Sequence, residues 1–486
     1  MALVLLATAC GGDSSTGSAL ARVRASGVLR WGGDVQGGEP YAFEDPSHPG
    51  RLVGFEVELA DAIARELHVR ARFVQNDWSN LVPSLDRGSF DIALNGLEVT
   101  PARSGSVTFT RPYYIFTEYL VVRADETRIH SLSDLQGRRV GTLASSLAWD
   151  MLRNVGADVV PYEGVEEPFQ DLEHGRTDAV VLDDIIATRY GLNRPTLKLA
   201  AQVGDGYYSI ATRQNDTDLA RAIDQALARI TRSGELRRIL ARSHIDSEKQ
   251  ARLATWTDQD TRDLVGTHSA SHMSGAHVWL FIEGAGTTLL VSTAAMLLAI
   301  TLGLGLALTR RYAPRPVALL AQVYVELFRG TPVLLQLYVI YFGLSNLSPH
   351  LQLAALPAAI LGLGLNYAAY ESEIYRAGMD AVPQGQMDAA AALNMSQWLA
   401  LRRILIPQAL RVALPGVTND FIALLKDSSL VSVITVVELT KRMTITAVDV
   451  RSWFLPGLLC AGLYLAMSYP LSRLSSYLEK RLQGEP

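Results

Sequence analysis

Residues 284–309 read GAGTTLLVSTAAMLLAITLGLGLALT and contain no charged side chain. At about 1.5 Å per residue, a helix of this length spans roughly 39 Å. That length exceeds the roughly 30 Å thickness of the hydrocarbon layer of a bilayer. The stretch therefore predicts a transmembrane helix that is tilted in the membrane.

Four more apolar stretches follow this one, which gives five predicted spans. The second contains Glu326 and Arg329, and the fourth has the least distinct ends. Arginines are concentrated after the first span, between the third and the fourth, and after the fifth, and such segments are usually cytoplasmic. We therefore expect the C-terminus in the cytoplasm and the residues before the first span outside the cell. The four stretches are residues 317–344, 353–370, 415–437 and 453–471.

The composition of the whole chain agrees with two unlike halves. The 486 residues are 49% hydrophobic and 19% charged, and the mean hydropathy of +0.14 lies between soluble and membrane proteins. A net charge of −5 gives no basic surface for nucleic acid. Two cysteines, Cys10 and Cys460, exclude a disulfide framework. Because His268, His272 and His277 lack the acidic or thiol partners of a metal site, we expect no metal and no cofactor.

The first 250 residues or so alternate strand-like and helical patterns. Residues 120–122 and 179–182 are short apolar runs typical of buried strands, and residues 56–67 carry apolar side chains on one helical face. This alternation predicts a soluble α/β domain over residues 21–250. We expect the small and polar residues 251–276 to be a linker to the membrane half.

The chain begins MALVLLATAC, a short apolar run that ends in a cysteine. The run resembles a lipoprotein signal whose cysteine becomes lipidated. An export signal also fits an α/β domain that lies outside the cell. We therefore expect residues 1–20 to be an export segment with Cys10 as its lipidation site; the alternative is that Cys10 is incidental.

Four motifs of the α/β half occur in a characteristic order. They are DWSNLVPSLDRGSFDIALNGLEVTPAR from Asp77, FTRPYY from Phe109, LQGRRVGTL from Leu135 and DAVVLDD from Asp178. Over about residues 25–245 this half resembles the polar amino-acid family of periplasmic solute-binding proteins. The resemblance implies a two-lobe α/β periplasmic-binding-protein fold of type II that holds its ligand between the lobes. It places lobe 1 at about residues 25–121 and 210–245, lobe 2 at about residues 122–209, and the crossing strands near residues 120–123 and 208–212.

Arg103 is the strongest candidate for ligand binding. Thr100 and Pro101 look like an N-cap and a proline at the first helical position, which places Arg103 in the first turn of a helix. A ligand carboxylate that arrives there would meet a bidentate guanidinium and free backbone N–H groups. We therefore expect Arg103 to bind the ligand's carboxylate, a role that the resemblance also implies.

The resemblance implies further ligand contacts. Ser146 falls where the family has a threonine that donates to the same carboxylate, although Ser145 replaces the glycine before it. Asp183 follows a strand-like run and matches the aspartate that takes the ligand's ammonium group, with Asp184 as a competitor. Trp78 matches an aromatic wall of the site. The remaining candidates are Asp34 and Gly96.

Glu98 departs from the family, which usually has a small hydroxyl side chain at this position. A carboxylate there adds negative charge beside Asp183. We hypothesise that the ligand is a zwitterionic or cationic polar amino acid, because unpaired like charges in a closed cleft cost several kcal/mol.

A polar helical stretch separates the third and fourth predicted spans and reads QMDAAAALNMSQWLALRRILIPQALRVALP from Gln386. It is too polar for lipid, so we predict a cytoplasmic helix pair at about residues 384–416. This stretch resembles the EAA loop of ABC import permeases, which contacts an ATPase. An asparagine stands where the loop usually has a turn glycine, and we expect the turn to survive because asparagine tolerates positive φ. The residues that match the motif are Asp388, Ala389, Ala390, Asn394 and Pro407.

Three further motifs, from Glu326, Tyr367 and Leu424, look like the polar amino-acid branch of the permease family. The resemblance implies that residues 277–486 form an all-α membrane domain of five transmembrane helices. Such a domain is an ABC type I importer permease, a multi-pass protein of the bacterial inner membrane. Charged residues inside the membrane are functional by default. The candidates for the pathway are Glu326, Arg329, Lys426 and Asp427.

The sequence contains no G-x-x-x-x-G-K-[ST] motif, so this chain does not supply a nucleotide-hydrolysing site. We therefore expect two copies of a separate ABC ATPase subunit as partners and no catalysis by this chain. Since five spans make half a pathway in this family, we also expect a homodimer in membrane lipid. The alternatives are an amino-acid-gated channel, whose spans would interrupt the binding domain, and a binding-protein-like enzyme with an acid or base in its cleft.

Overall fold

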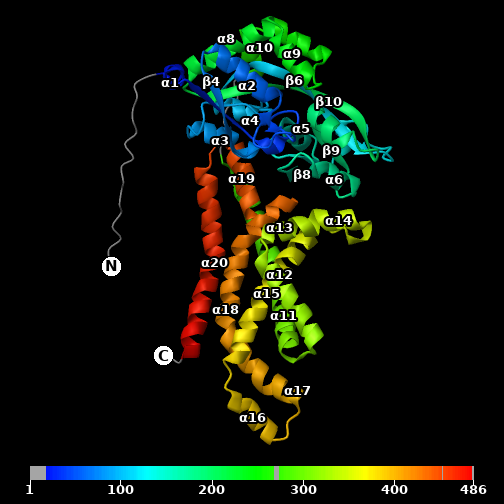
Figure 1. The fold of residues 1–486 in the computed structure, drawn as a ribbon, viewed down its shortest axis with the longest axis vertical. Coiled ribbons are helices and arrows are strands. Elements are labelled where there is room, and N and C mark those ends of the chain that lie inside the picture. Colours follow the sequence, from blue (N-terminus) through cyan, green and yellow to red (C-terminus); the bar gives the residue numbers. More distant parts are fainter. Residues whose placement is uncertain (1–17, 267–272, 451, 484–486) are drawn as a thin grey trace, which may run out of the picture.

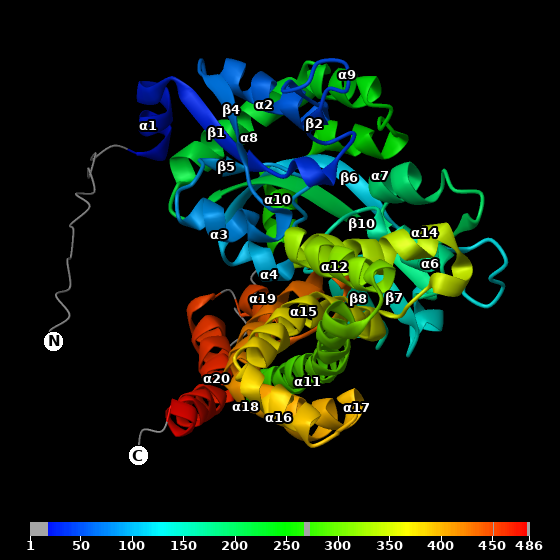
Figure 2. The same ribbon diagram turned by 60° about the horizontal axis from the view of Figure 1, so that its bottom comes forward.

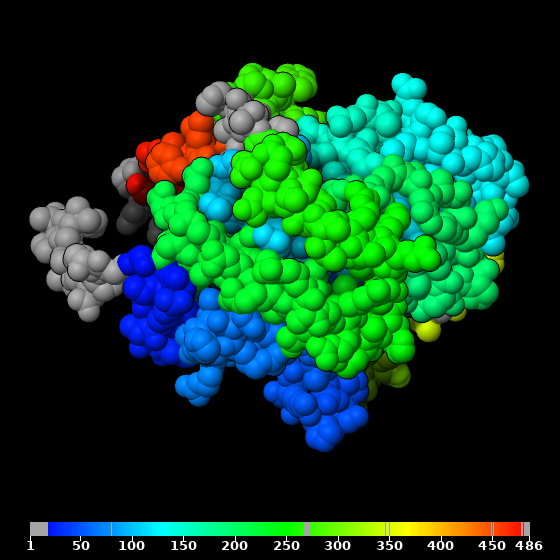
Figure 3. All heavy atoms as spheres, turned by 90° about the horizontal axis from the view of Figure 1, so that it is seen from above, coloured from blue at the N-terminus to red at the C-terminus, as the bar shows by residue number. Residues whose placement is uncertain are grey.

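The computed structural model describes residues 18–266, 273–450 and 452–483. Figure 1 shows an α/β half that lies on one end of a helical half. In a view from above, the α/β half covers most of the helical half (Figure 3). Most of the expected export segment, Cys10 included, lies outside the described residues.

One eight-stranded sheet runs through the α/β half in the order β4-β1-β5-β10-β6-β9-β7-β8. Three strands at each end are parallel to one another, and the two 17-residue strands β6 and β10 pair antiparallel between them. This arrangement gives two α/β lobes joined by two crossing strands. The strands are β1 Val28–Gly33, β4 Arg70–Gln75, β5 Ile92–Ala93, β6 Val107–Arg123, β7 Arg139–Leu143, β8 Asp158–Tyr162, β9 Ala179–Asp183 and β10 Leu197–Arg213.

The crossing point of β6 differs from the expected residues 120–123. Leu120 and Val121 pair with Val181 and Val180 of β9, so they belong to lobe 2. Both side chains are fully buried in the core of that lobe. The apolar run that suggested a hinge is therefore a core strand, and the crossing lies earlier in β6.

Amphipathic helices cover both lobes. In α8 the apolar side chains recur at helical spacing and form one buried face, and the expected helix at residues 56–67 forms as α2. A two-stranded sheet, β2 Phe43–Glu44 and β3 Leu52–Val53, lies beside the main one. The helices are α1 Ala19–Ser26, α2 Phe55–Glu66, α3 Leu81–Asp86, α4 Pro101–Ser104, α5 Leu147–Asn154, α6 Glu167–Glu173, α7 Asp184–Ile186, α8 Thr217–Arg232 and α9 Glu235–Arg242.

The expected linker begins too early in the sequence. Residues 251–265 form the end of a 3₁₀ helix, η5 Glu248–Thr255, and the helix α10 Asp258–Val265. Leu253 is buried, and the Trp256 ring lies 5.2 Å from the Tyr207 ring, centroid to centroid. This segment therefore packs on the α/β half, although its polar composition suggested a tether.

Figure 2 shows the helical half from a second angle. Among the described residues, Gly275–Tyr312 and Phe454–Tyr477 are long and apolar enough to cross a membrane. A bent helix pair, Arg315–Gly330 with Val333–Gly343, would make a third span. The elements are α11 Gly275–Tyr312, α12 Arg315–Gly330, α13 Val333–Tyr338, α15 Ala355–Asp380, α18 Ile406–Asp427, α19 Leu439–Asp449 and α20 Phe454–Gln483.

Two expected spans are not single straight helices. The stretch 317–344 is bent by 109° at Thr331-Pro332, because a proline disfavours helical backbone in the residue before it. The stretch 415–437 begins inside α18 and then passes into the 3₁₀ helix η9 Ser428–Ile434. Composition alone did not mark these breaks.

The helix pair predicted at about residues 384–416 is present. It consists of α16 Gln384–Ala392 and α17 Gln397–Ala400, which lie at the end of the helical half remote from the α/β half (Figure 1). Asn394 joins them at φ 57°, which confirms that asparagine adopts the left-handed turn expected of a glycine. The chain then continues through the π-helix Leu401–Leu405 into α18, so the second helix is continuous with a long helix of the bundle.

This geometry gives a prediction for the α16–α17 turn. Asn394→Val should lower the free energy of local opening by roughly 1–2 kcal/mol, because a β-branched residue resists the left-handed region. Asn394→Gly should keep the turn closed. Hydrogen exchange of residues 384–400 measures the opening, and equal protection in the two variants would contradict the role of the turn.

Candidate functional site

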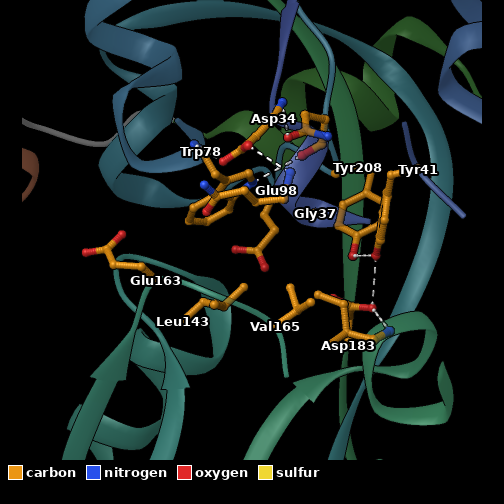
Figure 4. Close-up of a pocket in the computed structure, with 14 residues that line it drawn as sticks. Asp34, Gly37, Tyr41, Trp78, Glu98, Leu143, Glu163, Val165, Asp183 and Tyr208 are labelled. Atoms are coloured by element: carbon orange, nitrogen blue, oxygen red, sulfur yellow. Dashed lines mark hydrogen bonds between the residues drawn. The ribbon is translucent and has the colours of Figure 1, made fainter. Parts of the chain in front are cut away.

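A cavity of about 40 Å³ lies between the two lobes (Figure 4). Lobe 1 contributes residues after β1 and in the loop after β5, and lobe 2 contributes residues at the carboxyl ends of β7, β8 and β9. The residues that line it are Asp34, Gln36, Gly37, Tyr41, Trp78, Asn95, Gly96, Glu98, Leu143, Glu163, Val165, Asp183, Ile186 and Tyr208. Five of the seven predicted ligand-site residues are among them. Arg103 and Ser146 lie outside this lining.

Arg103 is buried at the junction of the lobes. As expected, Thr100 caps α4, and its hydroxyl accepts from the Arg103 backbone N–H at 3.4 Å. The guanidinium donates to the Glu98 carbonyl at 3.2 Å and to the Ser145 carbonyl at 3.1 Å. It also lies 4.5 Å from the Trp78 ring centroid. Arg103 is therefore held by both lobes, and its pKa is lowered by burial.

Glu98 points inward, toward Leu143 and Val165 of lobe 2 (Figure 4). Its carboxylate accepts from the Leu147 backbone N–H at 2.6 Å and lies 3.5 Å from the Arg103 guanidinium. Burial raises the pKa of Glu98 to about 7, and Arg103 opposes this shift. The side chain that departs from the family pattern thus takes part in the contact between the lobes.

Asp183 ends β9 and faces two tyrosines (Figure 4). Its carboxylate accepts from the Tyr41 hydroxyl at 3.2 Å and from the Ile186 backbone N–H at 2.9 Å. Burial raises the pKa of Asp183. The competitor Asp184 lines a different cavity, so of these two neighbours Asp183 is the one that faces this site.

Two predicted ligand contacts are occupied by structural hydrogen bonds. Asp34 accepts from the backbone of Gln36 and Trp78, both at 2.9 Å, and from the Gln75 amide at 3.0 Å. Ser146 caps α5, where its hydroxyl accepts from the Trp149 N–H at 3.1 Å. Asp34 therefore holds the Trp78 loop in place, and Ser146 starts the helix that meets Glu98.

Among the seven predicted ligand-site residues, Gly96 contributes through its backbone conformation, since it has no side chain. It has φ 55°, and its N–H donates to the buried Glu56 carboxylate at 2.6 Å. A Cβ there would lie 3.1 Å from the Tyr41 ring. Gly96 therefore lets the loop after β5 turn beside the tyrosines.

Sequence reasoning missed Tyr208 and Glu163. The Tyr208 hydroxyl lies 3.0 Å from that of Tyr41, and Tyr208 lies in a strand that was considered only as a hinge. Glu163 follows β8 and carries no motif. The lining is rich in acids, since Asp34, Glu98, Glu163 and Asp183 all contribute. The described part of the lining contains no lysine or arginine.

Glu163 also bonds to the helical half. It accepts a hydrogen bond from Lys441 of α19, whose side chain is 4% exposed. Nearby, the Tyr341 hydroxyl donates to Asp171 at 2.6 Å. Arg176 donates to the Tyr341 carbonyl at 2.8 Å and stacks on its ring. Lobe 2 is therefore joined to the helical half by buried hydrogen bonds to Tyr341 and by the ion pair of the exposed Glu163 with Lys441.

A second cavity, of about 650 Å³, lies between the α/β half and the segment that joins α19 to α20. Trp78 and Arg103 form part of its wall, and Ala447, Val448 and Trp453 form another part. The arginine of the site therefore faces space that the helical half also lines.

The pathway residues predicted in the helical half lie on two helices, one pair on α12 and one pair at the end of α18. Glu326 and Arg329 are exposed on α12, whereas Asp427 accepts from the Tyr367 hydroxyl at 2.8 Å. Lys426 is exposed beside it. The fully buried Glu371 of α15 was not predicted, because it lies in a run that was interpreted only as a motif. In the α16–α17 region, Asp388, Ala389, Asn394 and Pro407 are exposed and Ala390 is buried.

Comparison with known proteins identifies both halves. Residues 30–244 match the bacterial extracellular solute-binding proteins, family 3. Residues 299–484 match the binding-protein-dependent transport system inner membrane component.

Several permeases are similar to the helical half. A putative glutamine transport system permease protein of Rickettsia bellii is 34% identical over 208 residues, which are 42% of this chain and 94% of the relative. A probable amino-acid permease protein of Bacillus subtilis is 38% identical over 202 residues, 41% of this chain and 90% of the relative. An arginine transport system permease protein of Bacillus subtilis is 33% identical over 203 residues, 42% and 92% of the two chains.

Solved structures similar to the α/β half include a mutant of the arginine-binding protein of T. maritima. It is 30% identical, with a TM-score of 0.43, and the match covers 47% of this chain and 100% of the other. An ancestral arginine-binding protein bound to glutamine is 32% identical, with a TM-score of 0.42 and coverage of 45% and 99%.

The chain belongs to the amino-acid ABC importers, as a permease fused to a solute-binding domain. The family resemblance inferred from the motifs is thereby confirmed for both halves. The two-lobe fold, the helical permease domain and a place in the membrane follow from the same matches.

The raised pKa of Glu98 gives a pH prediction. Because burial raises the pKa of the Glu98 carboxyl from its usual 4.5 to about 7, this group contributes stability fully below pH 4.5, and the contribution is lost as the pH rises through 7. Glu98→Gln removes the titrating group. The stability of the variant relative to the unmodified protein should therefore increase between pH 5 and pH 8. Thermal unfolding of the full chain at a series of pH values tests this, and a pH-independent difference would contradict it.

Proposed function

We propose that this chain captures a polar or cationic amino acid outside the cell and conducts it across the membrane, driven by a separate ATPase. The observation that carries the proposal is the position of the binding cleft on the helical half. Glu163 lines the cleft and bonds to Lys441, and Arg103 faces a cavity that the α19–α20 segment also lines. A ligand released by the lobes would meet the permease domain directly.

The charges of the cleft support the ligand class. Arg103 is the candidate for the ligand's carboxylate, and Asp183 with its two tyrosines is the candidate for the ammonium group. Trp78 and Gly96 complete the walls. Since the remaining lining is acidic, a ligand with a second carboxylate is disfavoured. Glutamine and arginine transport by the relatives agrees with this class.

We further infer a membrane arrangement of five spans with the C-terminus in the cytoplasm. Besides the two apolar helices and the bent pair, α15 and α18 run alongside α11 in the same bundle (Figures 1 and 2). Glu326, Arg329, Lys426 and Asp427 remain candidates for the pathway. An export segment with a lipidated Cys10 would place the α/β half outside.

The exposed α16–α17 pair supports an ATPase contact. It lies at the far end of the bundle from the binding cleft (Figure 1), as a cytoplasmic coupling element requires. Five spans form half of a pathway, so we infer a homodimer with two ATPase subunits. Closure of the ATPases would then move the membrane helices as rigid bodies. In this proposal the chain binds and conducts its ligand and catalyses no reaction.

The proposal predicts the order of amino-acid affinities. The purified full chain should bind L-arginine or L-glutamine more tightly than L-glutamate in calorimetric titrations. Arg103→Ala should weaken this binding by roughly 10- to 100-fold, because a charge-assisted contact to a carboxylate is worth about 1.5–3 kcal/mol. Arg221→Ala, at an exposed arginine of α8 that lies outside the lining of both cavities, is the control that should leave the affinity unchanged. Tighter binding of L-glutamate would contradict the proposed ligand class.

A further inference from the structure

Arg103 and the first turn of α5 together hold a carboxylate, and that carboxylate is the side chain of Glu98. One of its oxygens accepts from the Leu147 N–H at 2.6 Å and lies 3.5 Å from the guanidinium. Both Glu98 and Arg103 are 6% exposed. A guanidinium beside the N–H groups of a helix start is the arrangement that binds the carboxylate of a ligand.

This contact crosses the cleft. Glu98 belongs to the loop after β5 in lobe 1, and Leu147 begins α5 in lobe 2. The Arg103 guanidinium also crosses, since it donates to the Ser145 carbonyl at 3.1 Å. The closed arrangement of the lobes therefore includes a carboxylate between them, and the protein itself supplies it.

Glu98 already occupies the donors that a ligand carboxylate would need. One of its oxygens accepts from the Leu147 N–H at 2.6 Å and lies 3.5 Å from the Arg103 guanidinium. A ligand carboxylate therefore cannot make the same contacts while Glu98 keeps this position. The two carboxylates compete for one site.

We propose that Glu98 is an internal substitute for the ligand's α-carboxylate, which holds the lobes together and must be displaced when an amino acid binds. The inference rests on the proposed function, because it requires a ligand that carries a carboxylate. The ligand carboxylate then replaces the Glu98 carboxylate at Arg103, so the net free energy of binding that this contact adds is reduced. An amine that lacks the α-carboxylate does not compete with Glu98 for Arg103. Glu98 therefore weakens the binding of amino acids but not that of such amines, and the difference in affinity between the two becomes smaller.

The test compares Glu98→Ser with the unmodified full chain in lipid nanodiscs. The ligands are L-arginine and agmatine, which is L-arginine without the α-carboxylate, and calorimetry gives each Kd. We expect the Kd for L-arginine to fall at least tenfold in the variant and the Kd for agmatine to change less than threefold. Weaker or unchanged L-arginine binding would overturn the proposal and would show that Glu98 recognises the ligand itself.

Glu163→Gln is the matched control. It removes one carboxylate from the same cavity, but Glu163 pairs with Lys441 and lies apart from Arg103. This variant should lack the tenfold gain for L-arginine. An equal gain would mean that the total negative charge of the cleft sets the affinity, and the specific role of Glu98 would be refuted.

A second measurement needs no ligand affinity. Spin labels at Asp61→Cys on lobe 1 and Gln136→Cys on lobe 2, both exposed positions, report the distance between the lobes. Both native cysteines are replaced by serine. Without added ligand, Glu98→Ser should shift the distances to longer values, and unchanged distances would contradict the proposal. If no amino acid binds to any variant, the proposed function fails, while these distances still decide the role of Glu98.

Discussion

The α/β half depends on one buried cation at the junction of its lobes. The Arg103 guanidinium contacts carbonyl groups of both lobes, the Glu98 carboxylate and the Trp78 ring. A buried charge is tolerated only when its hydrogen bonds are satisfied, and removal of one partner of a buried pair is costly. Closure of the lobes and recognition of a carboxylate are therefore properties of the same side chain.

A residue that lines the cleft also contacts the permease domain. Glu163 lines the cleft and bonds to Lys441 of α19, and Arg176 links Asp171 to Tyr341 in a buried network. Lobe 2 is therefore attached to the helical half at two places, the Tyr341 network and the Glu163–Lys441 ion pair. Fusion of the two domains keeps the binding cleft close to the pathway at a high effective concentration.

Local sequence signals predicted local structure well. The Thr100 cap, the helix at residues 56–67 and the left-handed Asn394 follow from side-chain chemistry within a few residues, and the structure contains all three. The bend between α12 and α13 also had a local signal, Pro332, but the prediction of a single span considered only the apolar composition. The polar composition of residues 251–265 suggested a tether. The sequence could not show that this segment packs on the α/β half, because the contact is with the distant Tyr207.

The site was harder to predict than the fold. Motifs located Arg103, Glu98 and Asp183, but no local pattern could show that Glu98 meets Leu147, 49 residues away. Asp34 was selected from the family resemblance, yet its carboxylate accepts hydrogen bonds from the Gln36 and Trp78 backbone. Hydrogen-bond partners of this kind are set by tertiary structure, which spacing in the sequence does not reveal.

This chain joins a binding domain to a permease domain that we propose is driven by a separate ATPase. Amino-acid uptake into proteoliposomes, measured with and without the partner ATPase and ATP, tests this dependence. We expect accumulation of L-arginine or L-glutamine against a gradient only when ATPase and ATP are both present. Accumulation by this chain alone would contradict it.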